Sequence, residues 1–480
     1  MGEKNKVGIR FSKEKNFSEW YQEVILKSEL ADYTAVSGCI AFRPLSYAIW
    51  ENIKCEIDKS LRKMGVKNVY FPLFIPEKNF DKMKEHVEGF SPEVAWVTEV
   101  GNKKLSERLA VRPTSETIMY PSYAKWIRSW KDLPMKYNQW NNVVRWEFKH
   151  PVPFLRTREF LWNEGHTVFA TRNEAEKEMG DIISLWDDFT RDYLALPSII
   201  GQKSEKEKFA GAEYSWSVEF ILPNGKAIQG PDAHFDGQKF AKAFDITFLD
   251  KNEKRQYPFQ NTWAISTRMI GIMTAIHGDD KGLVIPPKIA PNKGVVIPIL
   301  FKKDKEKVLR AARNVGKKLK KYNVLLDDRE DYSAGWKFNE WELKGVPIRI
   351  EIGPKDVSSK KVVLVRRDTG EKNIVGISNV VNEFRKLLDK IQENLYKRAK
   401  KDLASRIVNV KSLSELKKVV KNGKIGKASW CGSVKCEEDI KDKTGSKSLN
   451  SEFGGKLKKD EKCFACGDES KFVTYFGRSY

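Results

Sequence analysis

Arginine and acidic side chains alternate in residues 143–167 in a way that could bind a charged ligand. Arg145 and Glu147 are two residues apart in a predicted strand, so their side chains share one face of a sheet. The opposite face, which we predict to be buried, holds Val144, Trp146 and Phe148. Beyond a loop with two prolines come Arg156, Arg158, Glu159, Glu164 and His166. Guanidinium groups and carboxylates on a rigid sheet suit a planar polyanion such as a nucleotide. The alternative is a half-exposed hairpin with surface ion pairs, which are common and weak.

A second group of polar residues stands at a predicted junction between a strand and a helix. Residues 109–113 read as a strand that turns into a helix reaching about residue 130. Thr114 or Ser115 supplies the N-cap, and Glu116 lies in the first helical turn. Side chains at such a junction can face a cleft. The alternative is a plain capped helix.

Arg268 falls in the first turn of a helix predicted for residues 267–277, which follows a strand at residues 260–265. A cation there meets the positive end of the helix dipole, which is unfavourable. An anion bound at that point would remove the mismatch, because the helix N-terminus and the guanidinium both attract it. The alternative is a side chain that extends into solvent.

Four cysteines form two close pairs near the end of the chain. Cys431 and Cys436 are separated by 26 residues from Cys463 and Cys466. Four thiolates with this spacing fit tetrahedral zinc, with every position filled by protein, so we predict a structural metal. Disulfides are disfavoured in a reducing cytosol, and a thioredoxin-like pair would need a βαβ context that is missing.

The elements that must position these groups show clear periodicity. Residues 45–64 predict a long helix with apolar residues every four positions, followed by a short strand at 68–71. This stripe could pack on a second copy of the chain, or it could belong to an ordinary core helix. We also predict helices at 16–30 and 174–193, a hairpin of 214–222 with 226–228, and a strand at 243–249.

The second half of the sequence predicts a separate module. The proline-rich residues 284–294 read as a linker. Strands at 295–300, 323–326, 347–352 and 361–367 alternate with helices at 303–321 and 335–343, which indicates an α/β module with a mixed sheet. Ten lysines or arginines and two acids lie between Phe301 and Tyr322. This charge either faces RNA or is a solvated surface. A helix at 380–404 leads to the cysteine-containing part.

Composition limits the class of protein. The 480 residues carry 87 Lys and Arg against 65 Asp and Glu, a net charge of +22, which suggests a nucleic-acid partner. A lysine-rich proteome or growth at high temperature would also give this excess. No run of about 18 apolar residues exists, so no membrane span is expected. The first residues lack the apolar region of a secretory signal, and we expect a cytoplasmic protein.

Together these pieces resemble the class II aminoacyl-tRNA synthetases, most closely the prolyl branch of the archaeal and eukaryote-like type. The helix and strand that end at Pro72 are similar to motif 1, which forms homodimers. The stretch from Arg145 to residue 160 resembles motif 2, and the strand and helix carrying Arg268 resemble motif 3. Residues 112–116 and the Gly165-His166 pair are similar to the prolyl branch. The late α/β module resembles an anticodon-binding domain. The cysteine-containing domain after it resembles the zinc domain of this prolyl subgroup.

The resemblance implies a role for each matching residue. Arg145 would bridge the ATP α-phosphate and the proline carboxylate, and Arg268 would hold the γ-phosphate end. Proline would be bound by Thr114, Glu116, Arg145 and His234. ATP would be bound by Arg145, Glu147, Arg156, Thr157, Gln229, Asp232, Ser266 and Arg268. Mg²⁺ would accompany ATP, held by Gln229 and Glu219. Asp232 stands where the branch has a hydroxyl, and the Tyr480 carboxylate would fold back toward the active site.

The implied fold is a multidomain α/β and α+β chain with an antiparallel-sheet catalytic core. We expect the catalytic domain at 1–287, the anticodon-binding domain at 288–385, and a linker helix with a zinc-binding domain at 386–480. The expected activity attaches L-proline to tRNA(Pro) through prolyl-adenylate, with no inserted editing domain. The expected partners are tRNA(Pro), ATP, L-proline and a second copy of the chain. A threonyl or glycyl enzyme, a tRNA-binding regulator without catalysis and a zinc-containing RNA adaptor are the alternatives.

Overall fold

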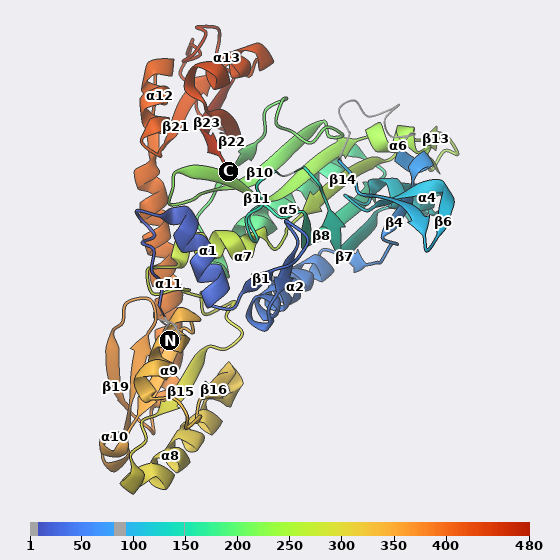
Figure 1. The fold of residues 1–480 in the computed structure, drawn as a ribbon. Coiled ribbons are helices and arrows are strands. Elements are labelled where there is room, and N and C mark those ends of the chain that lie inside the picture. Colours follow the sequence, from blue (N-terminus) through green and yellow to red (C-terminus); the bar gives the residue numbers. More distant parts are fainter. Residues whose placement is uncertain (1–7, 81–92, 148) are drawn as a thin grey trace.

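The computed structural model describes residues 8–80, 93–147 and 149–480. Figure 1 shows a broad sheet-containing body beside a long helix, α11 (Val380–Arg406), with a smaller α/β part at each end of that helix. The predicted helix at 380–404 is therefore confirmed, and it joins the two halves of the chain.

Within the described residues, the largest sheet has eleven strands in the order β20-β21-β23-β22-β9-β10-β11-β14-β8-β7-β3. In that order the strands are Ile407–Asn409, Ile425–Trp430, Phe472–Ser479, Lys447–Glu452, Ile199–Gln202, Tyr214–Ile221, Lys226–Gly237, Phe259–Ala264, Glu159–Phe169, Met135–Val144 and Lys67–Asn68. From β22 to β7 every neighbouring pair is antiparallel. The predicted antiparallel core and the hairpin of β10 with β11 are confirmed.

Four helices cover this sheet with apolar side chains: α1 (Phe17–Lys27), α2 (Pro44–Lys63), α5 (Arg172–Asp192) and α7 (Arg268–His277). In α2, Ile49, Ile53, Ile57 and Leu61 are buried inside this chain. The periodic stripe therefore belongs to an ordinary core helix, and it is not the surface available to a second copy.

The remaining elements of the body are short. Three strands form a separate sheet: β4 (Phe74–Pro76), β6 (Lys103–Val111) and β5 (Trp96–Val100). Two-stranded sheets join β1 (Ala31–Tyr33) to β2 (Ile40–Phe42), and β12 (Phe248–Leu249) to β13 (Arg255–Gln256). Helix α4 (Glu116–Trp126) follows β6, and 3-10 turns lie at Trp130–Asp132, Lys302–Asp304 and Lys320–Tyr322.

The strand predicted to carry Arg145 and Glu147 is shorter than expected. Strand β7 ends at Val144. The N–H of Arg145 still donates to the carbonyl of Arg158 at 2.8 Å, but the N–H of Arg158 donates to the carbonyl of Gly38, also at 2.8 Å, and so leaves the ladder. Trp146 is 41% exposed and Val144 is only partly buried, so the predicted buried face is wrong. Phe148 lies outside the described residues. Arg145 and Glu147 stand in a loop rather than on a strand.

The strand predicted at residues 243–249 is also largely wrong. Helix α6 (Lys239–Ala243) ends where the strand was expected to begin, and only Phe248 and Leu249 are extended. Asp245 has a φ of +51°, which belongs to the left-handed region and interrupts extended backbone.

The α/β module at the lower end of Figure 1 has a mixed five-stranded sheet, as predicted. Its strands are β16 (Val324–Leu326), β15 (Gly294–Pro298), β17 (Ile348–Ile352), β18 (Lys361–Arg366) and β19 (Lys372–Gly376), of which β19 is an addition to the prediction. Helices α8 (Lys305–Lys318), α9 (Ala334–Leu343) and α10 (Pro354–Ser358) accompany this sheet, and α11 packs against β18 and β19.

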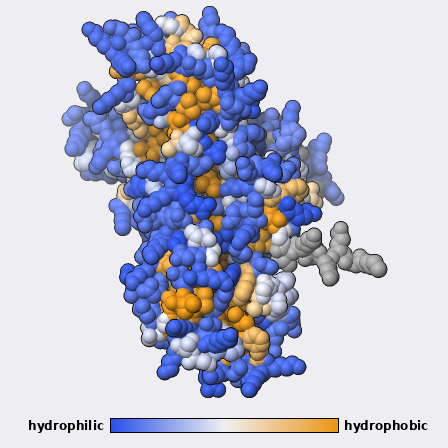
Figure 2. Space-filling view, turned by 90° about the vertical axis from the view of Figure 1, so that its left-hand side faces the viewer, coloured by the Kyte–Doolittle hydropathy of each residue, from blue (hydrophilic) through white to orange (hydrophobic). Residues whose placement is uncertain are grey.

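The C-terminal part adds helices α12 (Leu413–Lys421) and α13 (Val434–Thr444) to strands β20 to β23. Hydrophilic side chains cover most of the face in Figure 2, and apolar patches show in its upper and lower parts. Among the described residues, no helix is both long enough and apolar enough to cross a membrane.

Candidate active site

A cavity of about 380 Å³ lies over one face of the central strands β8, β10, β11 and β14. Seven predicted site residues line it: Thr114, Glu116, Arg145, Glu147, Gln229, Asp232 and His234. Five others do not: Arg156, Thr157, Glu219, Ser266 and Arg268. The seven predicted residues come from three separate stretches of sequence, 114–116, 145–147 and 229–234, which meet at this site.

The first wall of the cavity is the junction between β6 and α4. Ser115 occupies the N-cap position, but its side chain does not cap the helix. The Ser115 N–H and Oγ instead donate to Glu164, at 2.8 and 2.6 Å. Thr114 Oγ1 donates to Glu116 Oε2 at 2.5 Å. The expected N-cap position and the place of Glu116 in the first turn are confirmed, but the Ser115 hydroxyl oxygen accepts from Gln139 Nε2, at 3.0 Å, instead of from the helix.

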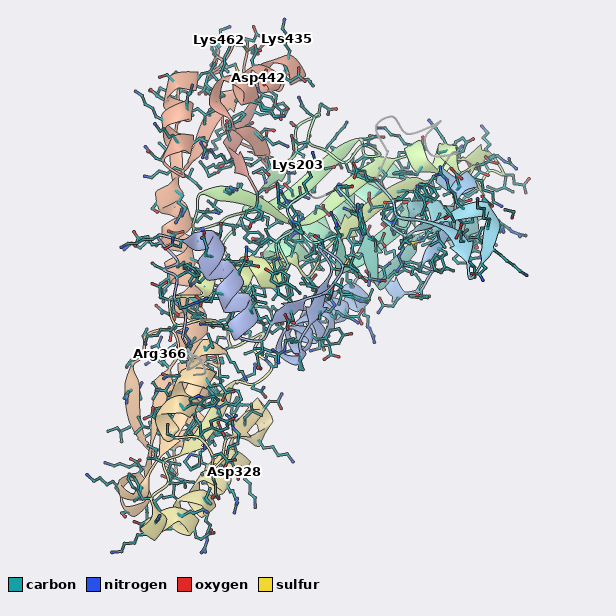
Figure 3. All side chains as sticks on the ribbon, in the orientation of Figure 1. Lys203, Asp328, Arg366, Lys435, Asp442 and Lys462 are labelled. Atoms are coloured by element: carbon teal, nitrogen blue, oxygen red, sulfur yellow. The ribbon has the colours of Figure 1, made fainter. Side chains whose placement is uncertain are left out.

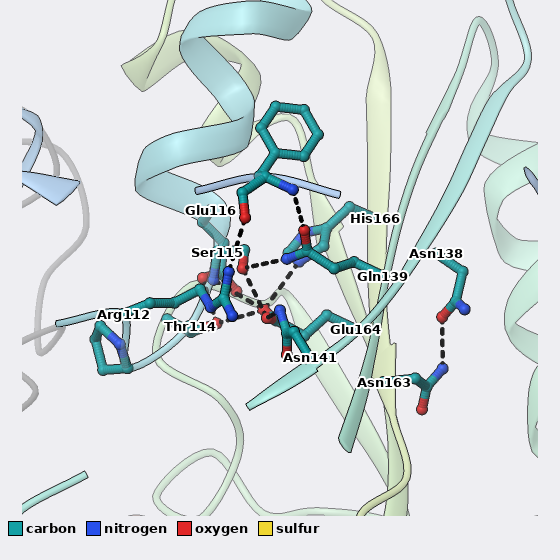
Figure 4. Close-up of polar contacts among 12 residues, drawn as sticks. Arg112, Thr114, Ser115, Glu116, Asn138, Gln139, Asn141, Asn163, Glu164 and His166 are labelled. Atoms are coloured by element: carbon teal, nitrogen blue, oxygen red, sulfur yellow. Dashed lines mark hydrogen bonds and ion pairs between the residues drawn. The ribbon is translucent and has the colours of Figure 1, made fainter. Parts of the chain in front are cut away.

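Glu164, on β8, is the centre of this polar network, which Figure 4 shows. Its carboxylate also accepts from Asn141 Nδ2 at 2.8 Å and lies 3.3 Å from His166 Nε2. Burial alone would raise the pKa of Glu164, but His166, Ser115 and Asn141 outweigh it and lower this pKa to about 2. Glu164 therefore carries a negative charge in the cavity wall.

The sequence prediction gave Glu164 no role, although it noted the residue. The available signal was the two-residue spacing of Trp162, Glu164 and His166, which places all three on one face of β8. Several further wall residues were missed, including Lys203, Phe209, Ser215, Trp216 and Ser217.

The opposite wall is formed by β11 and β10. Gln229 Nε2 donates to Asp232 Oδ2 at 2.7 Å, and the same oxygen lies 3.4 Å from His234 Nε2. His234 Nδ1 is 2.8 Å from Ser215 Oγ, which fixes the imidazole ring. Burial alone would raise the pKa of Asp232. His234, Arg145 and Lys203 lower it by more than burial raises it, so the pKa lies below its ordinary value. Asp232 is therefore a second charged carboxylate in the cavity wall.

Arg145 and Arg268 supply positive charge next to these carboxylates. Arg145 Nε donates to the carbonyl of Pro113 at 3.0 Å, and its guanidinium carbon lies 4.9 Å from the centre of a Trp162 ring. Arg268, the first residue of α7, donates to the carbonyls of Leu155 and Gln229, at 3.1 and 3.0 Å.

Burial lowers the pKa of Arg268, and the nearby Arg145 and Arg156 lower it further. Among the described residues, neither Arg145 nor Arg268 has a carboxylate oxygen within 4.0 Å. Two partly buried cations whose hydrogen bonds go only to neutral carbonyls form a site for an anion.

The other predicted residues lie around this cavity. Arg156 donates to the main-chain oxygen of Tyr480, and its guanidinium carbon is 5.6 Å from the centre of the Tyr480 ring. Thr157 lines a separate cavity of about 110 Å³. Glu219 is paired with Lys203 at 2.7 Å, and Ser266 Oγ accepts from the Arg268 N–H at 3.3 Å.

The four cysteines meet in the C-terminal part, as the spacing predicted. Their sulfur atoms all lie within 4.8 Å of one another. Cys436 and Cys463 are 3.8 Å apart, and Cys431 and Cys466 are 3.6 Å apart. Sulfur atoms bound to tetrahedral zinc at about 2.3 Å stand roughly 3.8 Å from one another. The thiols are free rather than disulfide-bonded, so the donor set and its spacing fit zinc.

Three sequence families match consecutive parts of the chain. Residues 96–277 match the tRNA synthetase class II core domain (G, H, P, S and T). Residues 293–387 match an anticodon binding domain, and residues 413–480 match the C-terminal domain of prolyl-tRNA synthetase.

Relatives match over almost the whole chain. The proline–tRNA ligase of Natranaerobius thermophilus is 48% identical over 97% of this chain and 96% of its own length. The bifunctional glutamate/proline–tRNA ligase of Cricetulus griseus is 46% identical over 99% of this chain, which spans only 33% of that protein. A crystal structure of prolyl-tRNA synthetase from Cryptosporidium parvum, complexed with halofuginone and AMPPNP, has a TM-score of 0.95 and 44% identity. That match covers 99% of this chain and all of the other.

Proposed function

This chain belongs to the proline–tRNA ligases, which are class II aminoacyl-tRNA synthetases, and we propose that proline and ATP react in the cavity between Thr114, Arg145 and Asp232. The chain attaches proline to tRNA(Pro) in two steps, ATP-dependent formation of prolyl-adenylate and transfer to the tRNA 3′ end. The observation that carries the proposal is the pair of arginines without carboxylate partners next to a wall of ionised carboxylates.

Proline binds through its two charged groups in this proposal. Its secondary ammonium donates to Glu116, which Thr114 orients, and His234 lies on the facing wall. Its carboxylate points to Arg145. A pocket of this shape excludes larger amino acids by steric clash, but each missing methylene of a smaller one costs only about 1–3 kcal/mol of discrimination.

ATP occupies the arginine side of the site. The proline carboxylate is already a nucleophile, so the enzyme has to align it with the α-phosphorus and stabilise the charge that grows on the phosphate oxygens. Arg145 binds the α-phosphate, and Arg268, at the N-terminus of α7, binds the γ-phosphate end with Ser266 nearby. Glu147, Arg156, Thr157, Gln229 and Asp232 hold the adenosine and the remaining phosphates.

Mg²⁺ would enter with ATP, and Gln229 and Glu219 offer the oxygen ligands that it prefers. The ammonium of Lys203 lies 2.7 Å from Glu219 and must move for this carboxylate to bind a cation. When bound, the ion would neutralise charge on the phosphates. Zinc would be held by Cys431, Cys436, Cys463 and Cys466 and would stabilise the C-terminal fold.

The chain is divided in this proposal into a catalytic domain (1–287), an anticodon-binding domain (288–385) and a linker helix with the zinc domain (386–480). The three family matches support that division. The free thiols support a reducing compartment, the cytoplasm. Residues 170–258, between the motif 2 and motif 3 strands, form core elements, which agrees with the absence of an editing insertion.

A homodimer is proposed through the segment that follows α2. Tyr70 and Phe74 are 71% and 47% exposed there, which is unusual for side chains of this size. Sedimentation velocity would show a mass of two chains, and Tyr70→Glu would shift it to one.

The decisive experiment is proline-dependent exchange of pyrophosphate into ATP. Proline should support exchange far above threonine or glycine. Glu116→Gln should raise the KM for proline about 100-fold and leave the KM for ATP unchanged, because a charge-assisted bond to the ammonium is lost. Equal exchange with glycine, or an unaltered KM for proline, would refute the assignment.

A further inference from the structure

One wall of the proline cavity is a loop rather than a strand. Residues 203–213 join β9 to β10, and five of them line the cavity: Lys203, Glu207, Lys208, Phe209 and Ala210. The ring of Phe209 lies 4.9 Å from the ring of His234. Whatever holds this loop therefore sets the shape of the pocket.

The C-terminal domain contacts the loop from outside. Ser204 Oγ donates to Glu437 Oε1 at 3.0 Å. Ser448 Oγ donates to the same oxygen, and all three residues are buried. Two ion pairs flank this contact: Lys206 with Glu438 at 2.7 Å, and Lys447 with Glu207 at 3.2 Å. Figure 3 labels Lys203, the first residue of this loop, on the side of the catalytic body that faces the C-terminal domain.

The same domain also supports the strands next to the loop. Strand β22 continues the catalytic sheet by pairing with β9. Asn450 Nδ2 donates to the carbonyls of Ile199 and Ser217, at 3.1 and 3.2 Å. The ring of Phe453 lies 4.7 Å from that of Trp216. Ser217 and Trp216 both line the cavity.

We propose that Glu437 is a positioning residue for proline binding, through which the C-terminal domain holds the pocket loop in place. The exposed ion pairs contribute little by themselves. The buried bond from Ser204 to Glu437 dominates, since an unpaired buried polar atom is costly. Glu437 follows Cys436 in α13. The same turn of this helix therefore carries one of the four clustered cysteines and the residue that bonds to the loop. This inference rests on the assignment of the cavity to proline.

The test compares three variants on α13 in the full-length protein. Glu437→Ala should raise the KM for proline about five- to tenfold in the exchange assay. The kcat and the KM for ATP should stay within about twofold of the wild-type values, because the loop contacts bound proline equally in the ground state and in the transition state. Glu437→Gln keeps an oxygen acceptor and should restore the KM. Asp442→Asn changes an exposed residue of the same helix and should have no effect.

Zinc content and the melting temperature are measured for each variant, because loss of the metal would disturb the whole domain. If Glu437→Ala loses zinc, Ser204→Ala decides the question from the loop side, and it should raise the KM for proline to a similar extent. An unchanged KM in the zinc-containing variants would overturn the proposal. If Glu116→Gln also left the KM for proline unchanged, the cavity assignment itself would be wrong.

Discussion

Glu164 shows how one buried charge organises the residues around it. Burial of an isolated carboxylate is strongly unfavourable, and here the bonds from Ser115 and Asn141 and the nearby His166 more than compensate. The network fixes Ser115, and with it the neighbouring Thr114 and Glu116 at the start of α4. We therefore expect Glu164 to influence proline binding through these neighbours.

The pKa of Glu164 predicts how stability depends on pH. Its folded value, about 2, lies below the ordinary value of 4.5. The stabilisation is therefore fully present above about pH 4.5 and is lost as the pH falls toward 2, with a size on the order of 3 kcal/mol. In Glu164→Gln this component should be missing, so the difference in unfolding free energy between wild type and variant should shrink on acidification. Urea titrations at pH 7 and pH 4 should show the first part of this loss, about 0.8 kcal/mol, and a difference that does not depend on pH would contradict the assignment.

Arg268 is predicted to be irreplaceable even by another cation. Its guanidinium spans two carbonyls, those of Leu155 and Gln229, which a single ammonium group cannot reproduce. Arg268→Lys should therefore raise the KM for ATP and lower kcat/KM for ATP by about 100-fold. Exchange kinetics with saturating proline test this. The KM for proline serves as the control, because it should change little.

Sequence alone could identify residues whose type is unusual at their position in a predicted element, or whose spacing is typical of a known site. Arg268 opposes a helix dipole, and the cysteines are paired at metal-binding spacing. The role of Glu164 was missed because it depends on donors up to 50 residues away in sequence. Thr157 and Arg156 were assigned by resemblance, and their contacts here lie outside the main cavity.

At the scale of elements, the close approach of β8 and β14 gives a sharp prediction at Gly165. A Cβ atom there would lie 2.1 Å from the buried ring of Trp263. Gly165→Ala should destabilise the protein by about 3 kcal/mol, because the ring and its strand must shift. The melting temperature measures the loss.

A matched substitution is available in α5. A Cβ atom at Gly180 meets nothing within 4 Å, so Gly180→Ala should stabilise the protein by about 0.5–1 kcal/mol through improved helix propensity. If both substitutions destabilised the protein, the loss of stability in Gly165→Ala could not be assigned to the packing of Gly165 against Trp263.

Helices were easier to predict than strand ends. The periodicity of α2, α5, α7 and α11 fixes their positions to within a few residues, since each buries a continuous apolar face. The end of β7 at Val144 depends instead on where the next N–H groups find acceptors. The N–H of Arg158, opposite Arg145, donates to the carbonyl of Gly38, 120 residues earlier in the chain, and local sequence does not encode this partner.

At the scale of the whole molecule, the joining of domains was not predictable from local patterns. Strand β22 extends the catalytic sheet by pairing Ser451 with Gln202, across about 250 residues of sequence. The sequence predicted both domains, and the only contact between them that the resemblance implied was the Tyr480 carboxylate folding back toward the active site. The catalytic sheet and the cysteine domain form one continuous structure, which explains how a C-terminal residue could shape the proline pocket.

An ion pair beyond the C-terminal end of α7 joins the anticodon-binding module to the catalytic body. Arg367 donates to both carboxylate oxygens of Asp279, at 2.8 and 2.6 Å, and to the carbonyl of Glu342. Asp279 follows α7, whose first residue is Arg268. Because Arg367 is almost fully buried, its removal should loosen the two parts.

We predict that Arg367→Ala separates the two steps of the reaction. Proline-dependent exchange uses only the catalytic cavity and should stay within about twofold of wild type, since the substituted residue lies outside it. Charging of tRNA(Pro) requires the module and the cavity to hold one tRNA together, so the KM for tRNA should rise about tenfold as effective concentration falls. Arg385→Ala, an exposed change on α11, is the control. If exchange and charging were lost in parallel, the Arg367–Asp279 ion pair would be needed to stabilise the catalytic body through α7. It would then not act by placing the anticodon-binding module.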